Sequence, residues 1–193
     1  MTFKRFYHSL RLLTIRDEYK RADYLRIHNI FGGIGEDCQW GPWLLPLYPE
    51  LIKLGNNVTV HKTAQIVVHD MINNFLQRCN PNVDYGSVEA LGPVEINDNV
   101  YISMGVIILP NTKIGSNCII SAGSVVHDDI PDNSIVAGNP AKVIGRFDAF
   151  AALRKMNSRN NPVFKNQFIS QDVSEKAWSL FYNKRSWKKE KDK

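Results

Sequence analysis

Aliphatic residues recur every six positions through the second half of the chain, a period that fits neither a helix nor a plain strand. The series is Ile96, Ile102, Ile108, Ile114, Ile120 and Val126. Four residues after each stands a small or β-branched residue, namely Val100, Val106, Thr112, Cys118, Ser124 and Ile130. Helical spacing would be three, four and seven, and a plain strand alternates for only about four to eight residues. A period of six alternates locally while turning the chain at intervals, which predicts a solenoid of short strands and corners.

The residues between the predicted strands suit corners. They form the groups Asn97-Asp98-Asn99, Pro110-Asn111, Gly115-Ser116-Asn117 and Ala122-Gly123-Ser124. Gly and Asn accept left-handed dihedrals, and Pro, Asp and Ser favour turns. The sequence therefore predicts a parallel β-helix whose rungs stack about 4.8 Å apart.

A second run with the same period lies upstream. It comprises Leu54, Val60, Ile66 and Ile72, with Val58 and Ala64 at the fourth offset, and a fragment of a third run, Ile34 to Cys38, precedes it. The pattern is interrupted between Met71 and Gly92. We therefore expect one long loop to leave the stack there.

The stretch VYISMGVIILPNTKIGSNCIISAGSVVHDDIPDNSIVAGNPAKVIG resembles the hexapeptide-repeat acyltransferases. It is most similar to their sugar O-acetyltransferase branch, which includes the maltose, galactoside and capsular-polysaccharide enzymes. The resemblance covers roughly Arg21 to Phe147, including KRADYLRIHNIFGGIGEDC and VVHDM. It implies an all-β core, a left-handed parallel β-helix shaped as a triangular prism. The expected organisation is an N-terminal helical extension (1–31), an acyltransferase domain (32–147) with an inserted loop (71–91), and a C-terminal helical tail (148–193).

Length and composition limit the number of domains and argue against a membrane span. The chain has 193 residues, enough for one domain with terminal extensions. No apolar run approaches the ~20 residues that cross a bilayer, and charges interrupt the apolar residues of MTFKRFYHSLRLLTIRDEYK. We expect this N-terminal stretch to be helical and the protein to be cytoplasmic, without a membrane span.

The cysteines and the net charge suggest no further chemistry. Cys38, Cys79 and Cys118 have no close spacing, so we expect core packing for Cys38 and Cys118 and neither a disulfide framework nor a metal site. The formal net charge is +5, and NKRSWKKEKDK at the end is strongly basic. Nucleic-acid binding would need a basic face interleaved with aromatic residues on a recognisable module, so we interpret this run as a solvated helical tail.

The C-terminal part also carries an aromatic group with helical spacing. Trp178, Phe181 and Tyr182 stand three and four positions apart. This predicts an amphipathic segment docked on the prism or on a neighbouring subunit. From Asp148 we expect one helix, a polar break around 157–162, and a second helix.

His69 is the candidate general base. Acyl transfer from a thioester to a hydroxyl requires a base, and imidazole suits neutral pH. Five histidines are present, and His69 stands in VVHDM where the stack opens into the loop. The resemblance assigns the role of base to this position. Asp70 falls at the inward offset, where an unpaired carboxylate is costly, so it either orients His69, as carboxylates do in triads, or caps the exiting turn.

The resemblance further implies acetyl-CoA as donor. Its pantetheine arm would lie along stacked rungs near Ser103, Met104, Gly105, Ala122, Gly123 and Ser124, where small corner residues let the backbone approach. The alternative is that the Gly and Ser residues only form the corners of the coil, and both roles are compatible. A backbone N–H between Ser103 and Gly105 is a candidate oxyanion donor.

Other residues near the expected coenzyme are charged or titratable. His127 stands where relatives often have a Thr followed by a Lys, and here the pair is His127-Asp128. Lys142 and Arg146 match the family's basic positions and are candidates for the 3'-phosphate. For His61, one residue after a repeat position, we expect no catalytic role.

Together these features predict an acetyl-CoA-dependent O-acetyltransferase acting on a sugar or surface-polysaccharide unit, with a place in polysaccharide biosynthesis and no metal requirement. The alternatives are N-acetylation of an amino sugar and a noncatalytic β-helix that serves as a scaffold or binding protein. Since relatives form trimers with active sites between subunits, we also expect a homotrimer.

Overall fold

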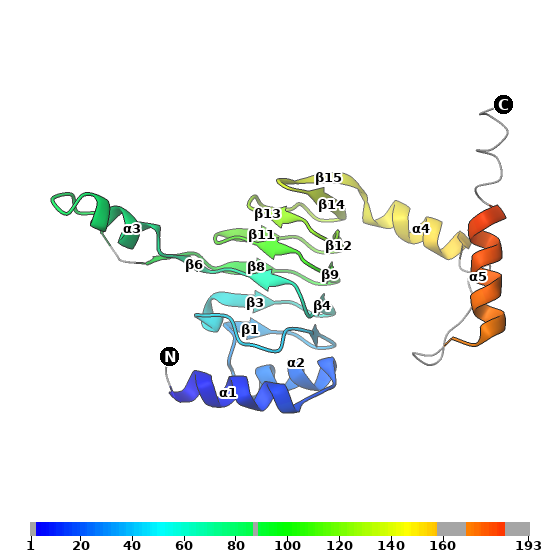
Figure 1. The fold of residues 1–193 in the computed structure, drawn as a ribbon, viewed down its shortest axis with the longest axis horizontal. Helices are drawn as coiled ribbons and strands as arrows, with labels where there is room; N and C mark the ends of the chain where they lie inside the picture. Colours follow the sequence, from blue (N-terminus) through cyan, green and yellow to red (C-terminus); the bar gives the residue numbers. More distant parts are fainter. Residues whose placement is uncertain (1–2, 87–88, 158–168, 184–193) are drawn as a thin grey trace. The chain divides into compact units, whose positions relative to one another are not determined.

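The structure, a computed structural model, describes residues 3–86, 89–157 and 169–183. The chain divides into two compact units, Met1–Ala151 and Ala152–Lys193, and each is described by itself. The first unit contains a stack of short parallel strands wound as a three-faced coil (Figure 1). This coil is the predicted parallel β-helix.

Three sheets form the faces of the coil. The first face consists of β1 (Gly33–Ile34), β3 (Ile52–Leu54), β8 (Val94–Ile96) and β11 (Thr112–Ile114). The second face consists of β2 (Gln39–Trp40), β4 (Val58–Val60), β9 (Val100–Ile102), β12 (Cys118–Ile120), β14 (Ser134–Gly138) and β15 (Ala141–Arg146). The third face consists of β5 (Gln65–Ile66), β10 (Ile107–Ile108) and β13 (Val125–Val126).

The register confirms that three hexapeptides make one turn of the coil. Ile102 pairs with Ile120, and Ile108 pairs with Val126, so partners stand eighteen residues apart in the sequence. All these pairs are parallel, and β15 alone among the strands of the three faces runs antiparallel to its neighbour, β14. Residues that are successive along one side of the prism therefore come from successive turns of the chain.

The core lies inside the coil at the predicted positions. Every member of the series from Ile96 to Val126 is at most 1% exposed, and the fourth-offset residues from Val100 to Ile130 are buried with them. Burying these aliphatic side chains is the main favourable term for such a coil. The upstream run holds through Ile66, but Ile72 is 58% exposed. Its expected place in the stack is wrong because the chain has already left the coil at that point.

The corners adopt the conformations that their residues favour. Asn57, Asn99, Asn117 and Asn133 all have φ between 54° and 59°. Three of them form a ladder, with Asn57 Nδ2 donating to Asn99 Oδ1 and Asn99 Nδ2 donating to Asn117 Oδ1. Asn accepts this left-handed region more readily than most residues, so the repeated Asn fixes one edge of the prism.

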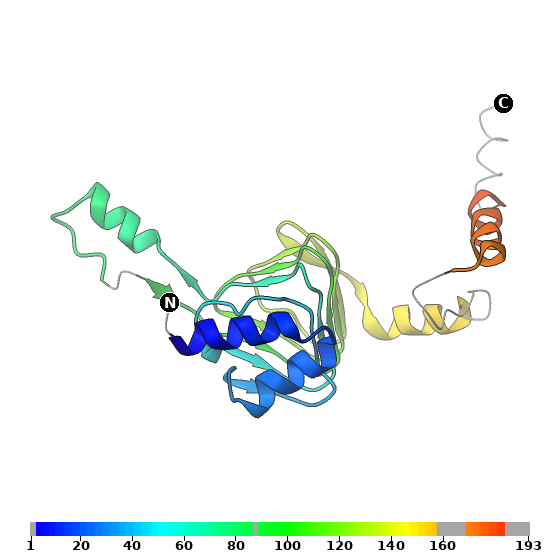
Figure 2. The same ribbon diagram turned by 60° about the horizontal axis from the view of Figure 1, so that its bottom comes forward.

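Two helices cover the N-terminal end of the stack (Figure 2). They are α1 (Phe3–Thr14) and α2 (Glu18–Ile27), and their Leu12 and Leu25 are fully buried. The side chain of Asp17 caps α2 by accepting the N–H of Lys20. The helices thus close the open end of the hydrophobic core.

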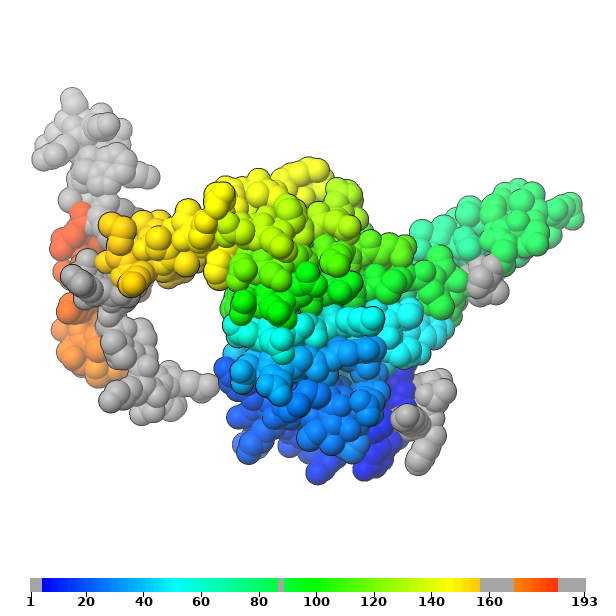
Figure 3. All heavy atoms as spheres, turned by 180° about the vertical axis from the view of Figure 1, so that it is seen from behind, coloured from blue at the N-terminus to red at the C-terminus, as the bar shows by residue number. Residues whose placement is uncertain are grey.

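An arm leaves the coil between the third and first faces. It begins with β6 (His69–Asp70), continues through α3 (Ile72–Cys79) and returns as β7 (Ala90–Leu91). β6 and β7 pair antiparallel, and the arm projects from the coil (Figures 1 and 3). The predicted excursion of 71–91 is present, but it contains a helix and a two-stranded base where we expected a loop.

The described part of the chain after the coil contains two helices. α4 (Phe147–Asn157) follows β15, and α5 (Gln171–Asn183) lies in the second unit. Trp178, Phe181 and Tyr182 form a ring cluster on α5 and are 55%, 41% and 63% exposed. The expected polar break and the basic tail fall mostly on 158–168 and 184–193, outside the described residues. A short 3-10 turn, η1 (Pro49–Leu51), precedes β3.

Candidate active site

His69 lies where the chain leaves the third face to form the arm. It is the first residue of β6 and pairs with Leu91 of β7. Its side chain is half-buried, and its Nδ1 atom is buried without a hydrogen-bond partner among the described residues. The side chain also lines the cavity described below. An imidazole in this setting can take a proton from a hydroxyl.

Tyr48 contacts the His69 ring. The two ring centroids are 5.6 Å apart, with the ring planes at 82°, an edge-to-face arrangement. The Tyr48 hydroxyl donates a hydrogen bond of 2.5 Å to Oε2 of Glu89, and this bond raises the pKa of Tyr48. Sequence reasoning missed both residues, because they stand 41 positions apart and no local motif connects them.

Asp70 does not occupy the buried inward position that we expected. Its side chain is half-exposed, and Val68, 1% exposed, takes the last inward place before the arm. Oδ1 of Asp70 accepts the backbone N–H of Ile72 at 2.9 Å. Of the two roles considered, this contact matches the cap of the exiting turn.

Small residues line the corner between the second and third faces. Gly105 and Gly123 stack there with φ of 67° and 73°, and the N–H of Gly123 donates to the carbonyl of Met104. A Cβ on Gly123 would meet nothing within 4 Å, so open space borders its backbone. Ala122 is also exposed, and Met104 is 57% exposed. A flexible chain can approach the backbone along this corner, as the coenzyme arm would require.

The side chains and N–H groups at this corner make further contacts. Ser124 is fully buried, and its hydroxyl donates to the carbonyl of Ser121, so a coenzyme could meet only its backbone, which is the kind of contact that we expected. The N–H of Ser103 donates to Ile120, and that of Gly105 donates to the Thr63 hydroxyl. Neither of these two groups is available as an oxyanion donor in this arrangement.

The third face links the candidate base to the candidate coenzyme corner. Ser103 to Gly105 and Ala122 to Gly123 precede its strands, whereas His69 and His127 follow them. The chain crosses this face between Gly105 and Leu109, roughly 13 Å at the rise of a strand. The structure therefore places these candidates along the two edges of one face.

The charged candidates differ in their surroundings. Nδ1 of His127 lies 2.9 Å from Oδ1 of Asp128, and both side chains are exposed. Lys142 pairs in register with Ala137, whereas Arg146 pairs with Ser134 at the other end of β15. Arg146 also forms an ion pair with Asp148, and this contact holds the pKa of Asp148 well below its usual range. The Lys142 side chain is exposed and has no hydrogen bond or ion pair within the described ranges.

A cavity of about 430 Å³ opens beside His69. Segment 40–47 forms one wall and β5 with its flanking residues forms the other. The lining is apolar except for Lys62, Gln65 and His69. Concave, largely apolar sites of this size commonly hold small molecules.

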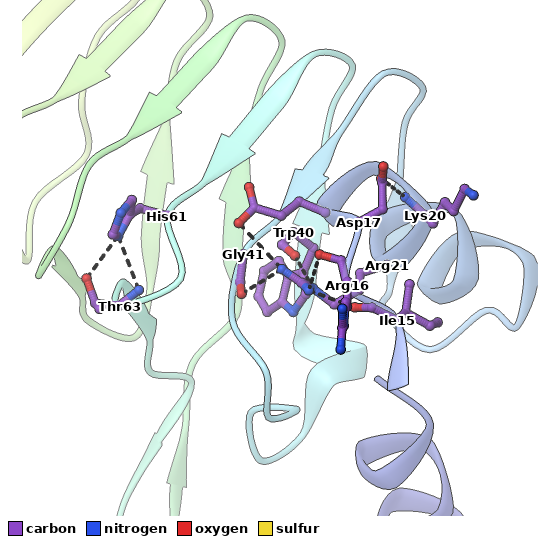
Figure 4. Close-up of polar contacts among 10 residues, drawn as sticks. Ile15, Arg16, Asp17, Lys20, Arg21, Trp40, Gly41, His61 and Thr63 are labelled. Atoms are coloured by element: carbon purple, nitrogen blue, oxygen red, sulfur yellow. Dashed lines mark hydrogen bonds and ion pairs between the residues drawn. The ribbon is translucent and has the colours of Figure 1, made fainter. Parts of the chain in front are cut away.

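Arg21 holds the wall of this cavity in place (Figure 4). Its side chain is 1% exposed and donates hydrogen bonds to the carbonyls of Trp40 and Gly41 at 2.8 and 3.0 Å. Its guanidinium also lies 4.4 Å from the ring centroid of Trp43. His61 contacts Thr63 and not His69. Its Nδ1 atom is hydrogen-bonded to the Thr63 hydroxyl at 3.0 Å (Figure 4).

No group of three or more His, Cys, Asp or Glu side chains that could hold a metal ion occurs in the described ranges. No helix in the described part of the chain has the length and apolarity to cross a membrane.

Comparison with known sequences identifies the repeats. Residues 93–128 match the family model described as Bacterial transferase hexapeptide (six repeats). Two curated relatives share the name “Putative acetyltransferase”. One, from Schizosaccharomyces pombe, is 39% identical over 98 residues, 51% of this chain and 44% of the relative. The other, from Bacillus subtilis, is 30% identical over 113 residues, 58% of each. The chain thus spans about half the length of these relatives.

Solved structures show the same coil. A maltose O-acetyltransferase from Clostridium difficile 630 is 30% identical with a TM-score of 0.50, and the match covers 74% of this chain and 86% of that one. A hexapeptide-repeat acetyltransferase from Vibrio cholerae, complexed with acetyl coenzyme A, is 21% identical with a TM-score of 0.54 and coverage of 75% and 85%. At that identity the second likeness concerns the fold.

Proposed function

This chain belongs to the hexapeptide-repeat transferase family, and on that premise we propose that it is an acetyl-CoA-dependent O-acetyltransferase of a sugar or surface-polysaccharide unit. His69 carries the proposal, because its half-buried imidazole lines a largely apolar cavity at the edge of the third face. Similarity to a maltose O-acetyltransferase supports a sugar as acceptor. We infer as well that the coil winds to the left, as the resemblance implies.

The proposed reaction transfers an acetyl group from sulfur to oxygen. Nε2 of His69 takes the proton of the acceptor hydroxyl while the oxygen attacks the thioester carbonyl. The tetrahedral intermediate then collapses, the C–S bond breaks, and the imidazolium returns the proton to the leaving thiolate. An acetate ester and free coenzyme A are the products, and no redox partner is needed.

We place the donor on the third face. Its pantetheine arm would follow the corner of Gly105 and Gly123, whose positive φ values and open flank let the backbone come close. Lys142 would contact the 3'-phosphate, because its side chain is exposed and unpaired within the described ranges. Arg146, already paired with Asp148, contributes less.

We place the acceptor in the cavity beside His69. Among the residues that line it, Lys62 is cationic and none is a carboxylate. A protonated amino sugar would therefore find no opposite charge in this lining, whereas a neutral or anionic acceptor meets no repulsion. This observation favours a hydroxyl acceptor over the alternative of an amino group.

We propose a homotrimer from the distribution of outward side chains. The first face is charged, with Lys53, Glu95 and Lys113 outward. The outward positions of the other two faces are largely apolar or aromatic, as at Tyr101, Ile119, Ile135, Ile107 and Val125. Exposed apolar residues of the arm, including Ile72, Phe75 and Leu91, likewise need a partner surface. Closed cyclic symmetry would cover all of these at once.

A panel of acceptors tests the proposed activity. The purified protein is incubated with acetyl-CoA and neutral, anionic or amino sugars. Release of coenzyme A is followed by chromatography, because a thiol reagent would also react with the exposed Cys79. We expect release that depends on a hydroxyl acceptor, and a product whose acetyl group is removed by hydroxylamine. An alkali-stable amide would support the N-acetyltransferase, and acetyl-CoA binding without turnover on any acceptor would support the scaffold.

Subunit mixing tests the shared site. One variant lacks the base (His69→Ala), and another has the coenzyme corner blocked by Ala122→Trp. Light scattering should give the mass of about three chains for each. Refolding the two inactive variants together should restore some turnover, because some interfaces then pair an intact base with an intact corner. A fully active monomer would contradict the trimer.

A further inference from the structure

The orientation of His69 is not set by the kind of contact that usually sets it. A catalytic histidine commonly donates from its second ring nitrogen to a carboxylate or carbonyl, which fixes both the tautomer and the ring. In the described part of the chain, Nδ1 of His69 has no such partner. The adjacent carboxylate, Asp70, is bonded instead to the N–H of Ile72. Another contact must hold the ring.

Tyr48 makes that contact with its aromatic ring. The edge-to-face arrangement of Tyr48 and His69 restricts rotation of the imidazole. If the imidazole rotated, it would lose this favourable contact between the edge of one ring and the face of the other. Tyr48 itself has little freedom. Its φ is 52° and ψ is 55°, an uncommon conformation for a residue with a Cβ, and Pro49 follows it. Such backbone strain clusters at functional sites.

Glu89 fixes the other end of the Tyr48 side chain. The hydroxyl donates to its carboxylate at 2.5 Å, and hydrogen bonds to ionised groups are short and strong. Glu89 immediately precedes Ala90 of β7, which pairs with Asp70 of β6. The contacts therefore form a closed circuit from His69 to Tyr48, to Glu89, and back through the two strands at the base of the arm.

We propose that Tyr48 is a positioning residue for His69 and that Glu89 acts through Tyr48. This inference rests on the proposed function, because it takes His69 as the base. It assigns a role in turnover to two residues that lie outside the hexapeptide match. It also makes the geometry of the base depend on the return strand of the arm, which carries Glu89 to Tyr48.

A double-mutant cycle tests the link between the two residues. Tyr48→Phe keeps the ring that packs against the core and removes only the hydroxyl. Glu89→Ala removes the acceptor. We expect each to lower kcat by roughly tenfold, with KM for acetyl-CoA and the urea midpoint unchanged. The double variant should lose no more than either single variant, because both delete one contact.

Conservative replacement and matched controls separate positioning from stability. Glu89→Gln keeps an oxygen that can accept the Tyr48 hydroxyl, so it should retain most of kcat. Tyr19→Phe and Glu95→Ala make the same chemical deletions on exposed residues, whose side chains contact Gln39 and Lys113 respectively, and should leave kcat unchanged. Additive losses in the double variant, or a loss of kcat that follows a loss of stability, would overturn the proposal.

A spectroscopic measurement tests the positioning role without relying on turnover. The imidazole resonances of His69, assigned by their loss in His69→Ala, should shift in both Tyr48→Phe and Glu89→Ala. Resonances that stay in place in both variants would overturn the positioning role. If wild-type protein transfers no acetyl group while the resonances shift as expected, the proposed function fails and the coupling of Tyr48 to His69 stands.

Discussion

Replacing Ile96 by alanine should destabilise the coil far more than the matched replacement of its neighbour Glu95. Ile96 lies in β8, 1% exposed, between Leu54 of β3 and Ile114 of β11. Glu95 points outward from the same strand and forms an ion pair of 3.5 Å with Lys113, with both side chains about half exposed. The pair of variants thus compares the two sides of one strand.

The expected loss follows from the volume removed. Ile→Ala deletes three carbon groups, worth about 0.8 kcal/mol each in transfer free energy. The aliphatic neighbours on adjacent turns are held by the ladder and cannot collapse fully, so a residual cavity adds to the cost. We expect Ile96→Ala to lower the free energy of unfolding by about 3–4 kcal/mol. Glu95→Ala should cost less than about 1 kcal/mol, as exposed ion pairs do.

Urea unfolding followed by circular dichroism measures both values. The variants are compared with the wild type at one protein concentration, because association would make the midpoint concentration-dependent. The slope of the transition should stay the same, so that the shift of the midpoint reports stability. Similar small losses for Ile96→Ala and Glu95→Ala would refute the assignment of the sixfold series to the core.

Three more predictions test other parts of the molecule. Lys142→Ala should weaken the binding of acetyl-CoA, measured by calorimetry, more than the binding of the coenzyme that lacks the 3'-phosphate. It should also weaken acetyl-CoA binding more than Arg146→Ala does. Equal weakening of both coenzymes would remove Lys142 from the site. A thiol reagent should label Cys79 quickly in the native protein and all three cysteines after unfolding, because burial raises the pKa of the other two thiols; fast labelling of more than one thiol would contradict the packing. Phe75→Glu should reduce the mass found by light scattering while leaving the circular dichroism spectrum unchanged, since this arm residue is 57% exposed in the single chain; an unchanged trimer would exclude the arm from the contact.

The fold could be predicted from the sequence because its pattern is local and repeated. A coil of six-residue sides buries the same two positions on every side, so Ile102 and Val106 report the same environment as Ile120 and Ser124. The pattern fails where the chain leaves the coil. Ile72 keeps the spacing by sequence, but it belongs to α3 and is exposed.

The candidate site was only partly accessible to the same reasoning. Asp70 shows one reason: the sixfold spacing places it inward, but the chain has already left the coil there and its side chain is half-exposed. The contact of Tyr48 with Glu89 shows another, since it joins distant segments through side chains that carry no repeat signal. The pairing of the arm strands, which sets Leu91 opposite His69 and Glu89 beside Tyr48, is a tertiary feature that local spacing does not encode.

Acetyl transfer by His69→Ala tests the central claim most directly. The variant is assayed for acceptor-dependent release of coenzyme A, and its affinity for acetyl-CoA is measured by calorimetry. With His69 as general base, turnover falls by roughly two to four orders of magnitude while acetyl-CoA binding and the circular dichroism spectrum are unchanged. Turnover within a few-fold of the wild type would contradict the account, because the proton of the acceptor would then leave by another route.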